Sequence, residues 1–329
     1  MTTKTLGSLA GLIAILVIAF LILDYGNNSS SASNKLIPDL ESQMNDVSSV
    51  VIRKGNESVT VQKSDDGWVV VERSEYLANI GTLRDLLLGI ADAQIIERKT
   101  SDPDKYHLIG VNDPSDEASE SVEVIIAGDD FEHAVLLGTP AQSSYRFARP
   151  KDQAQSVLID QNPDIPDGAG GWLANELVDI GAERVQQVII SHADGEKVTV
   201  EKPSPDAPNF DLIDIPDGRE LSYPTVANGM AAALAELTLD DVRSAPAQPS
   251  TPVTTATIRT FDGLQIDVTE DEDGAWLSFL ATAADIAETD VQDEAAQIND
   301  RVKGWQYAIP EHKASLLKRR LEELLKAVE

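Results

Sequence analysis

A short stretch of sequence occurs twice in this chain, and the repetition constrains the fold more than any other feature does. The stretch VTVQK spans residues 59–63, and VTVEK spans residues 198–202. A run rich in β-branched residues and a glycine-containing turn precede each copy, and a second turn and another apolar run follow it. Runs of this kind separated by such turns are typical of β-hairpins. Each copy therefore predicts a strand within a set of antiparallel strands.

Each predicted hairpin is followed by a helical pattern, and the two patterns share one register. The aligned pairs, each separated by 147 positions, are Tyr76 and Tyr223, Leu83 and Met230, Leu87 and Leu234, and Ile90 and Leu237. Apolar residues at these spacings lie on one face of a helix. More strand-like segments follow each helix. Hairpins beside helices, without alternation of single strands and helices, predict an α+β fold with antiparallel sheets.

The predicted fold class is α+β, with an N-terminal transmembrane helix followed by two tandem repeats of antiparallel sheet plus helix. We place the repeats at residues 37–162 and 172–329, joined by a linker at 163–171 that has the composition of a loop. The second repeat ends in a predicted amphipathic helix at residues 311–329. Its apolar face comprises Leu317, Leu321, Leu324, Leu325 and Val328. This face could cap the sheet of the second repeat, dock on a partner subunit or lie on a membrane.

An apolar run near the N-terminus predicts a membrane anchor. Residues 6–23 are 18 residues without a charge. A helix of that length rises about 27 Å, close to the thickness of the hydrocarbon core of a bilayer. We predict an uncleaved signal anchor at residues 1–25 and a flexible tether at 26–36, although Ser31-Ala32-Ser33 leaves cleavage open. Lys4 before the run predicts a single-pass protein of the inner membrane, with the bulk of the chain periplasmic.

The charge and the cysteine content exclude several classes of function. The formal net charge is -30, and a surface of this sign repels nucleic acid and anionic lipid headgroups. The chain has no cysteine, which excludes disulfides, thiolate catalysis and cysteine zinc sites. We therefore expect no nucleic-acid partner.

No motif in the sequence predicts catalysis. The four histidines are His107, His133, His192 and His312, and none has another histidine at a metal-ligand spacing. The acidic turn at residues 269–274 fails as an EF-hand, because Thr269 and Leu280 would occupy positions that need a carboxylate. We interpret Glu270, Asp271, Glu272 and Asp273 as solvated carboxylates of a hairpin turn. We predict no catalytic, cofactor-binding or metal-binding residue, no cofactor and no enzymatic activity.

A second acidic stretch follows the last predicted hairpin. Residues 285–294 hold Asp285, Glu288, Asp290, Asp293 and Glu294. The apolar residues that accompany this charge run are Ile286, Val291, Ile298 and Val302. The pattern predicts a partly helical acidic surface segment, either simply solvated or in contact with a basic partner.

Several turn and packing segments together resemble one bacterial family. They are residues 97–111 (ERKTSDPDKYHLIGV), 136–150, 171–180 (GWLANELVDI), 237–242 (LTLDDV) and 304–317 (GWQYAIPEHKASLL). In these the chain resembles the domain of unknown function 4340. The resemblance covers about residue 36 to the C-terminus and carries no functional residue. It implies a membrane-anchored extracytoplasmic protein associated with ABC-type transport systems of the gliding-motility kind.

The expected function is that of a non-catalytic auxiliary protein that contacts the membrane subunits of an ABC-type transporter. The alternative is an extracytoplasmic ligand-binding module that uses the cleft between the repeats. The tryptophans that could line such a cleft are Trp68, Trp172, Trp276 and Trp305. Two hydrophobic cores would also use them, and we favour that interpretation.

Overall fold

The computed structural model describes residues 34–65, 67–116, 119–142, 144–248 and 251–327. The chain divides into two compact units. The first unit comprises residues up to Asn56 together with Arg84–Asp164. The second comprises Glu57–Leu83 together with Ile165–Glu329.

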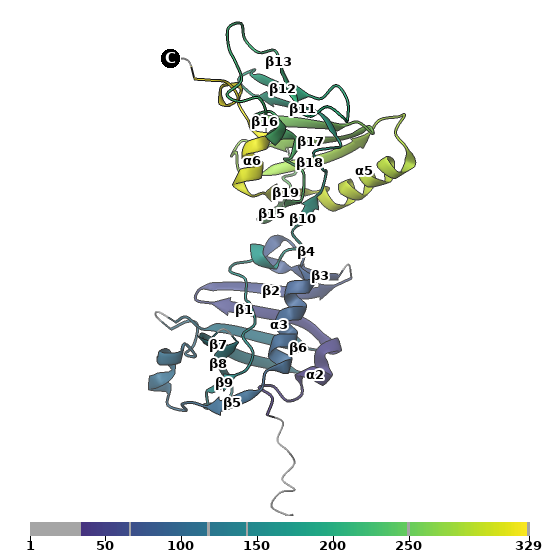
Figure 1. Ribbon diagram of the computed structural model, residues 1–329. Coiled ribbons are helices and arrows are strands. Elements are labelled where there is room, and N and C mark those ends of the chain that lie inside the picture. The colour runs from purple at the N-terminus through teal and green to yellow at the C-terminus, as the bar shows by residue number, and fades with distance from the viewer. Residues whose placement is uncertain (1–33, 66, 117–118, 143, 249–250, 328–329) are drawn as a thin grey trace, which may run out of the picture. The chain divides into compact units, whose positions relative to one another are not determined.

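Strands make up most of the regular structure, and they form two large antiparallel sheets and one small sheet (Figure 1). The first large sheet has the order β4-β3-β2-β1-β6-β7-β8-β9-β5. The second has the order β13-β12-β11-β16-β17-β18-β19-β15, and β10 pairs with β14. Without β4, the two large sheets follow the same order of eight strands, because β1 to β3 occupy the places of β11 to β13 and β5 to β9 those of β15 to β19.

The elements of the first unit are α2 Leu40–Gln43, the 3₁₀ helix Met44–Asp46, β1 Val47–Lys54, β5 Ile95–Arg98, the 3₁₀ helix Pro103–Ile109, β6 Val122–Gly128, β7 Glu132–Gln142, β8 Tyr145–Pro150 and β9 Val157–Ile159. Helix α3, Ile80–Asp92, ends in this unit. Strands β1 and β6 pair Val50 with Ile126 and Ile52 with Val124. All four side chains are buried, because alternate residues of a strand face the same side and one side is the core.

The second unit opens with β2 Glu57–Ser64, β3 Gly67–Val70, the 3₁₀ helix Val71–Arg73 and β4 Tyr76–Leu77. It continues with the 3₁₀ helix Gly170–Trp172, β10 Glu176–Val178, β11 Val185–His192, β12 Lys197–Glu201, β13 Asp211–Ile213, α4 Asn228–Ala231, β14 Leu237–Thr238 and β15 Asp241–Ser244. It ends with β16 Thr254–Thr260, β17 Leu264–Glu270, β18 Leu277–Ala283, α5 Thr289–Val302, β19 Trp305–Ala308, α6 Glu311–Leu317 and the 3₁₀ helix Leu321–Glu323. Helix α5 packs against β18 (Figure 1).

The repeated sequence motif lies in two corresponding strands. Val59 and Val61 are buried on β2, and Val198 and Val200 are buried on β12. In the first large sheet β2 lies between β3 and β1, and in the second β12 lies between β13 and β11. The motif is therefore a core-facing strand in both places, as its alternation predicts. The predicted boundaries of the repeats stay a prediction.

The predicted fold class is wrong in its balance of helix and strand. The described residues form mainly antiparallel sheet, with 38% strand and 21% helix. In the part of the chain that the structure describes, no helix is long and apolar enough to cross a membrane. The predicted anchor helix at residues 6–23 lies outside the described residues. At the end of the predicted tether, Leu36 donates to the carbonyl of Ala93 at 2.8 Å and is buried.

Two predicted helices are shorter than the sequence pattern suggests. In the stretch that follows Tyr223, α4 has four residues, although Met230, Leu234 and Leu237 are all buried. Gly229 within α4 weakens it, and Glu236 has a left-handed φ of 46° that ends the helical path. The apolar spacing here reports burial and not a continuous helix.

The predicted C-terminal helix is interrupted in the same way. Helix α6 ends at Leu317, and Arg320 has extended backbone with φ −92° and ψ 153°. This break lets the Leu321 N–H donate to the Glu196 carboxylate at 2.6 Å. Leu317, Leu324 and Leu325 are buried, so the apolar face packs within the second unit. The prediction of a helix in the acidic stretch is confirmed by α5, which buries Val291, Ile298 and Val302.

Candidate functional site

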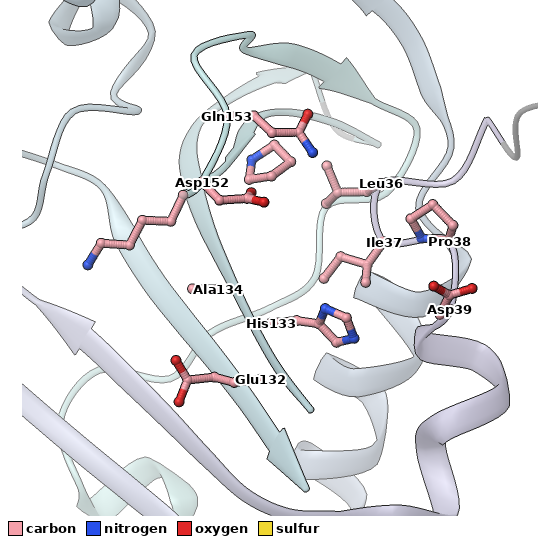
Figure 2. Close-up of a pocket in the computed structure, with 11 residues that line it drawn as sticks. Leu36, Ile37, Pro38, Asp39, Glu132, His133, Ala134, Asp152 and Gln153 are labelled. Carbon is pink, nitrogen blue, oxygen red and sulfur yellow. The ribbon is translucent and has the colours of Figure 1, made fainter. Parts of the chain in front are cut away.

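The first unit has an open cavity of about 400 Å³ beside His133, which we call the His133 cavity (Figure 2). Three segments form its walls: the stretch that leads into α2, the start of β7, and the turn after β8. The lining residues are Leu36, Ile37, Pro38, Asp39, Glu132, His133, Ala134, Pro150, Lys151, Asp152 and Gln153. In Figure 2 the side chains of Leu36 and Ile37 point into the same space as the ring of His133.

Backbone hydrogen bonds and one side-chain contact hold these walls in place. The Lys151 N–H donates to the carbonyl of Ala134 at 2.9 Å, which ties the turn to β7. The His133 ring lies 5.4 Å from the ring of Phe131, and its Nε2 is 2.7 Å from the Gln43 side-chain oxygen. The cavity wall is therefore built on a strand and a turn fixed by that strand, and such supports position a site well.

The cavity is acidic, because its lysine is already committed to other carboxylates. The Lys151 ammonium pairs with the buried carboxylate of Glu123 and lies 4.0 Å from Asp113. Asp39, Glu132 and Asp152 are exposed and form no ion pair with any described residue. A hydrogen bond from the Ser115 hydroxyl, joined by that of its backbone N–H, lowers the pKa of Asp113. The free charges around the cavity are therefore negative.

The second unit has two further cavities that share one wall, and we call the pair the β10 groove. The Leu77 cavity, about 350 Å³, is lined by Tyr76, Leu77, Ala78, Asn79, Ile80, Ala174, Asn175, Glu176 and Arg301. The Glu236 cavity, about 410 Å³, is lined by Glu176, Leu177, Val178, Asp179, Glu236, Leu237, Thr238 and Arg301. Glu176 and Arg301 belong to both linings, so the two cavities adjoin along β10.

Short backbone pairings bring residues distant in sequence together at the Leu77 cavity. The Asn79 N–H donates to the carbonyl of Trp172 at 2.7 Å, and the Ala174 N–H donates to that of Leu77 at 2.9 Å. Beneath this cavity an aromatic cluster is packed edge to face, with Tyr76 at 5.0 Å from Trp305 and 6.1 Å from Tyr307. Burial raises the pKa of both tyrosines, so their hydroxyls stay protonated. The floor is therefore formed by packed aromatic rings.

The structure separates the four histidines that the sequence offered. His133 lines a cavity, whereas His107 and His312 are exposed. His192 is buried, with Nδ1 3.2 Å from the Thr254 hydroxyl and Nε2 3.4 Å from the carbonyl of Arg319. In the stretches that the structure describes, no group of three or more acidic, histidine or cysteine residues is placed to hold a metal ion.

The interpretation of the acidic turn as solvated carboxylates is wrong for two of its four residues. Glu270 is buried and lies 2.5 Å from the Lys318 ammonium. Asp271 is buried and pairs with Arg243, whose guanidinium stacks 4.5 Å from the ring of Trp276. Glu272 and Asp273 are exposed, as expected. A buried carboxylate needs a cationic partner, and both partners lie far along the chain, so the local pattern could not indicate them.

The tryptophans divide between the core and its border. Trp172 is fully buried, and Trp305 belongs to the aromatic cluster. Trp68 and Trp276 are partly exposed.

The β10 groove takes its residues from segments about a hundred positions apart. The His133 cavity likewise joins segments from across the first unit, and neither site follows from a motif.

Comparisons with known proteins identify one family. The family described as a domain of unknown function (DUF4340) matches residues 68–257, more than half of the chain. No curated protein and no solved structure matches the chain significantly.

Proposed function

Because the chain belongs to the DUF4340 family, we propose that it is a non-catalytic interaction protein on the extracytoplasmic side, an auxiliary component of an ABC-type transport assembly. The resemblance of its packing and turn segments to the family supports the link to transport. The single observation that carries the interaction role is the β10 groove. There Leu77 is 47% exposed and Ile80 is 51% exposed, next to charged residues that form no ion pair with described residues.

Exposed apolar side chains that adjoin cavities favour contact with a partner. Large apolar residues scattered singly are ordinary on a surface, but apolar residues gathered at a concave site mark interaction surfaces. Leu77 and Ile80 lie in one cavity wall, over the aromatic cluster of Tyr76 and Trp305. A floor of packed aromatic rings with a charged border is the arrangement typical of an interface core and its rim.

Two carboxylates near the C-terminal segment have the electrostatics of structural groups. Catalytic acids need a pKa raised toward the working pH. Here the N–H of Glu196 lowers the pKa of Asp194, the N–H of Leu321 lowers that of Glu196, and Arg320 adds to both effects. These carboxylates stay ionised at neutral pH, and they fasten the C-terminal segment to the turn between β11 and β12. Charges held in this way stabilise the structure.

The test is co-purification after cross-linking in intact cells. A C-terminal tag, mild detergent and mass spectrometry should recover permease and ATPase subunits of an ABC-type transporter with the full-length chain. Cells that express the untagged chain at the same level provide the control. Recovery of the chain alone, with efficient cross-linking of known complexes in the same sample, would refute the proposed function.

A second candidate function is the binding of a small cationic solute, and the His133 cavity favours it. Its volume lies within the range of ligand pockets, about 300–1,000 Å³. Asp39, Glu132 and Asp152 give it negative charge without a partner among described residues. Calorimetry with putrescine or arginine tests this function, with Asp152→Asn as the variant and the exposed Asp217→Asn as the control. A heat of binding for the Asp152→Asn variant equal to that of the unaltered chain would refute this function.

A further inference from the structure

We propose that the β10 groove binds an extended segment of a partner protein that carries an apolar side chain and, two residues further along, a lysine or arginine. This inference rests on the proposed function, since it names the chemistry of the contact. The two cavities share Glu176 and Arg301 in their walls, so they adjoin each other. Side chains two residues apart in an extended segment point to the same side, about 7 Å apart, so both can enter adjoining cavities.

The Leu77 cavity supplies the apolar half of the recognition. Leu77, Ala78, Ile80 and Ala174 contribute apolar walls, and Tyr76 contributes the floor. An aliphatic or aromatic side chain that enters this cavity removes apolar surface from water on both molecules. The floor costs little to order, because its rings are already packed within the second unit.

The Glu236 cavity supplies the charged half of the recognition. Its charged residues are Glu176, Asp179, Glu236 and Arg301, and together they leave a net negative charge. The Asp179 carboxylate accepts the N–H of Glu236 at 2.7 Å and so helps to hold Glu236 in its left-handed conformation. That conformation is costly for a residue with a side chain, and Glu236 lines the cavity. A lysine or arginine is the side chain that complements this charge.

Backbone groups on both sides of β10 are already hydrogen-bonded, which favours recognition of the partner segment through its side chains. Arg301 donates to the carbonyl of Leu177 at 2.8 Å. On the opposite side, the Leu239 N–H donates to the carbonyl of Asn175 at 2.9 Å, and Glu176 pairs with Thr238 of β14. Addition of a strand to a sheet edge needs unpaired backbone groups, and these carbonyls do not provide them. Side-chain anchoring in the two cavities is the mode that remains.

The experiment measures peptide binding to the purified full-length chain by fluorescence anisotropy. The probe is a fluorescein-labelled octapeptide of serine and threonine that contains one leucine and, two positions further along, one arginine. Control peptides replace the leucine with serine or the arginine with glutamate. The groove variants are Leu77→Ser and Glu236→Gln, and the matched exposed controls are Leu280→Ser and Asp217→Asn. All four positions are exposed, and circular dichroism verifies that each variant is folded.

We expect the leucine–arginine peptide to bind and both control peptides to bind more weakly. Leu77→Ser should raise Kd about tenfold through lost apolar contact, and Glu236→Gln about threefold to fivefold, with less effect at high salt. The control variants should leave Kd unchanged. Equal binding by all peptides, or equal Kd for groove and control variants, would overturn the inference.

The same variants separate this inference from the proposed function. They are introduced into the tagged chain used for cross-linking in cells. If the Leu77→Ser variant no longer recovers transporter subunits and the Leu280→Ser variant still does, the result supports both the groove as the contact and the proposed function. Undiminished recovery from the groove variants overturns the groove as the contact and leaves the proposed function standing. Failure of the unaltered chain to recover any transporter subunit, with no peptide bound, overturns both.

Discussion

Replacement of Arg243 by methionine should destabilise the second unit by about 3 kcal/mol. The Asp271 side chain is 6% exposed and the Arg243 side chain is 37% exposed, so the carboxylate depends on its partner far more than the guanidinium does. Removal of one partner from a buried pair costs about 3–5 kcal/mol, and the partial exposure of this pair places the cost at the lower end. Arg243→Met also removes the hydrogen bond to Gln306 and the contact with Trp276.

A double-mutant cycle isolates the pair itself. Asp271→Asn leaves a guanidinium that can reach water, and we expect it to cost about 1 kcal/mol. The double variant buries no unpaired charge, and we expect it to cost about 2 kcal/mol, with a coupling energy of about 2 kcal/mol. Urea unfolding at neutral pH, followed by both circular dichroism and tryptophan fluorescence, measures these values and detects separate transitions of the two units.

The control for this cycle is Arg259→Met. Arg259 is exposed and donates to Gln187 and Gln265 on the surface of the sheet. The same chemical change there should alter the unfolding free energy by less than about 1 kcal/mol. Costs for Arg243→Met and Asp271→Asn that add within about 0.5 kcal/mol in the double variant would refute the reasoning.

Acid should destabilise the second unit partly through Asp262. Burial would raise the pKa of Asp262, but hydrogen bonds from Thr260 and Arg184 outweigh it and lower that pKa. The folded pKa is below the unfolded value of about 3.9, so the stabilisation is complete above that pH and is lost as the pH falls through the folded pKa. Unfolding of Asp262→Asn should therefore depend less on pH in this range than unfolding of the unaltered chain, and an unchanged dependence would contradict the reasoning. Ile298 is buried on one face of α5, and Ile298→Ala should reduce the free energy of unfolding by about 2–4 kcal/mol. Ile286 is 95% exposed, and Ile286→Ala should be neutral in the same urea assay. Equal costs for the two variants would contradict the burial argument.

The sequence predicted the elements whose signal is local. The alternation in the repeated VTV motif requires only that one face of a strand be buried, and Val61 and Val200 are buried as that pattern predicts. Helix α3 could be predicted as well, because the spacing of the buried Leu83, Leu87 and Ile90 matches one face of a continuous helix. After Tyr223 the same spacing gave a wrong length, since burial of an apolar residue does not require helical backbone around it.

The sites could not be predicted, because their partners meet only in three dimensions. Asp271 has the local context of a solvated turn, and its partner Arg243 lies 28 positions earlier on another strand. The Leu77 cavity requires residues 172–174 to pair with residues 77–79. Neither pairing leaves a trace in the spacing of nearby residues. Burial that is set by a distant partner is invisible to a local pattern.

The shared strand order of the two large sheets gives a physical reason to look for function outside the strands. Strands β7 and β17 hold the same place in their sheets, but β7 begins with Glu132 and His133 beside a cavity, whereas β17 begins with the buried Leu264. The turn after β8 contributes Lys151 to that cavity, while β18 leads toward α5. A core strand tolerates few changes, because close packing constrains the size of each side chain. The connections and strand ends are less constrained, and these two differences lie there. Binding surfaces are accordingly expected at these connections, as at β10 and beside His133.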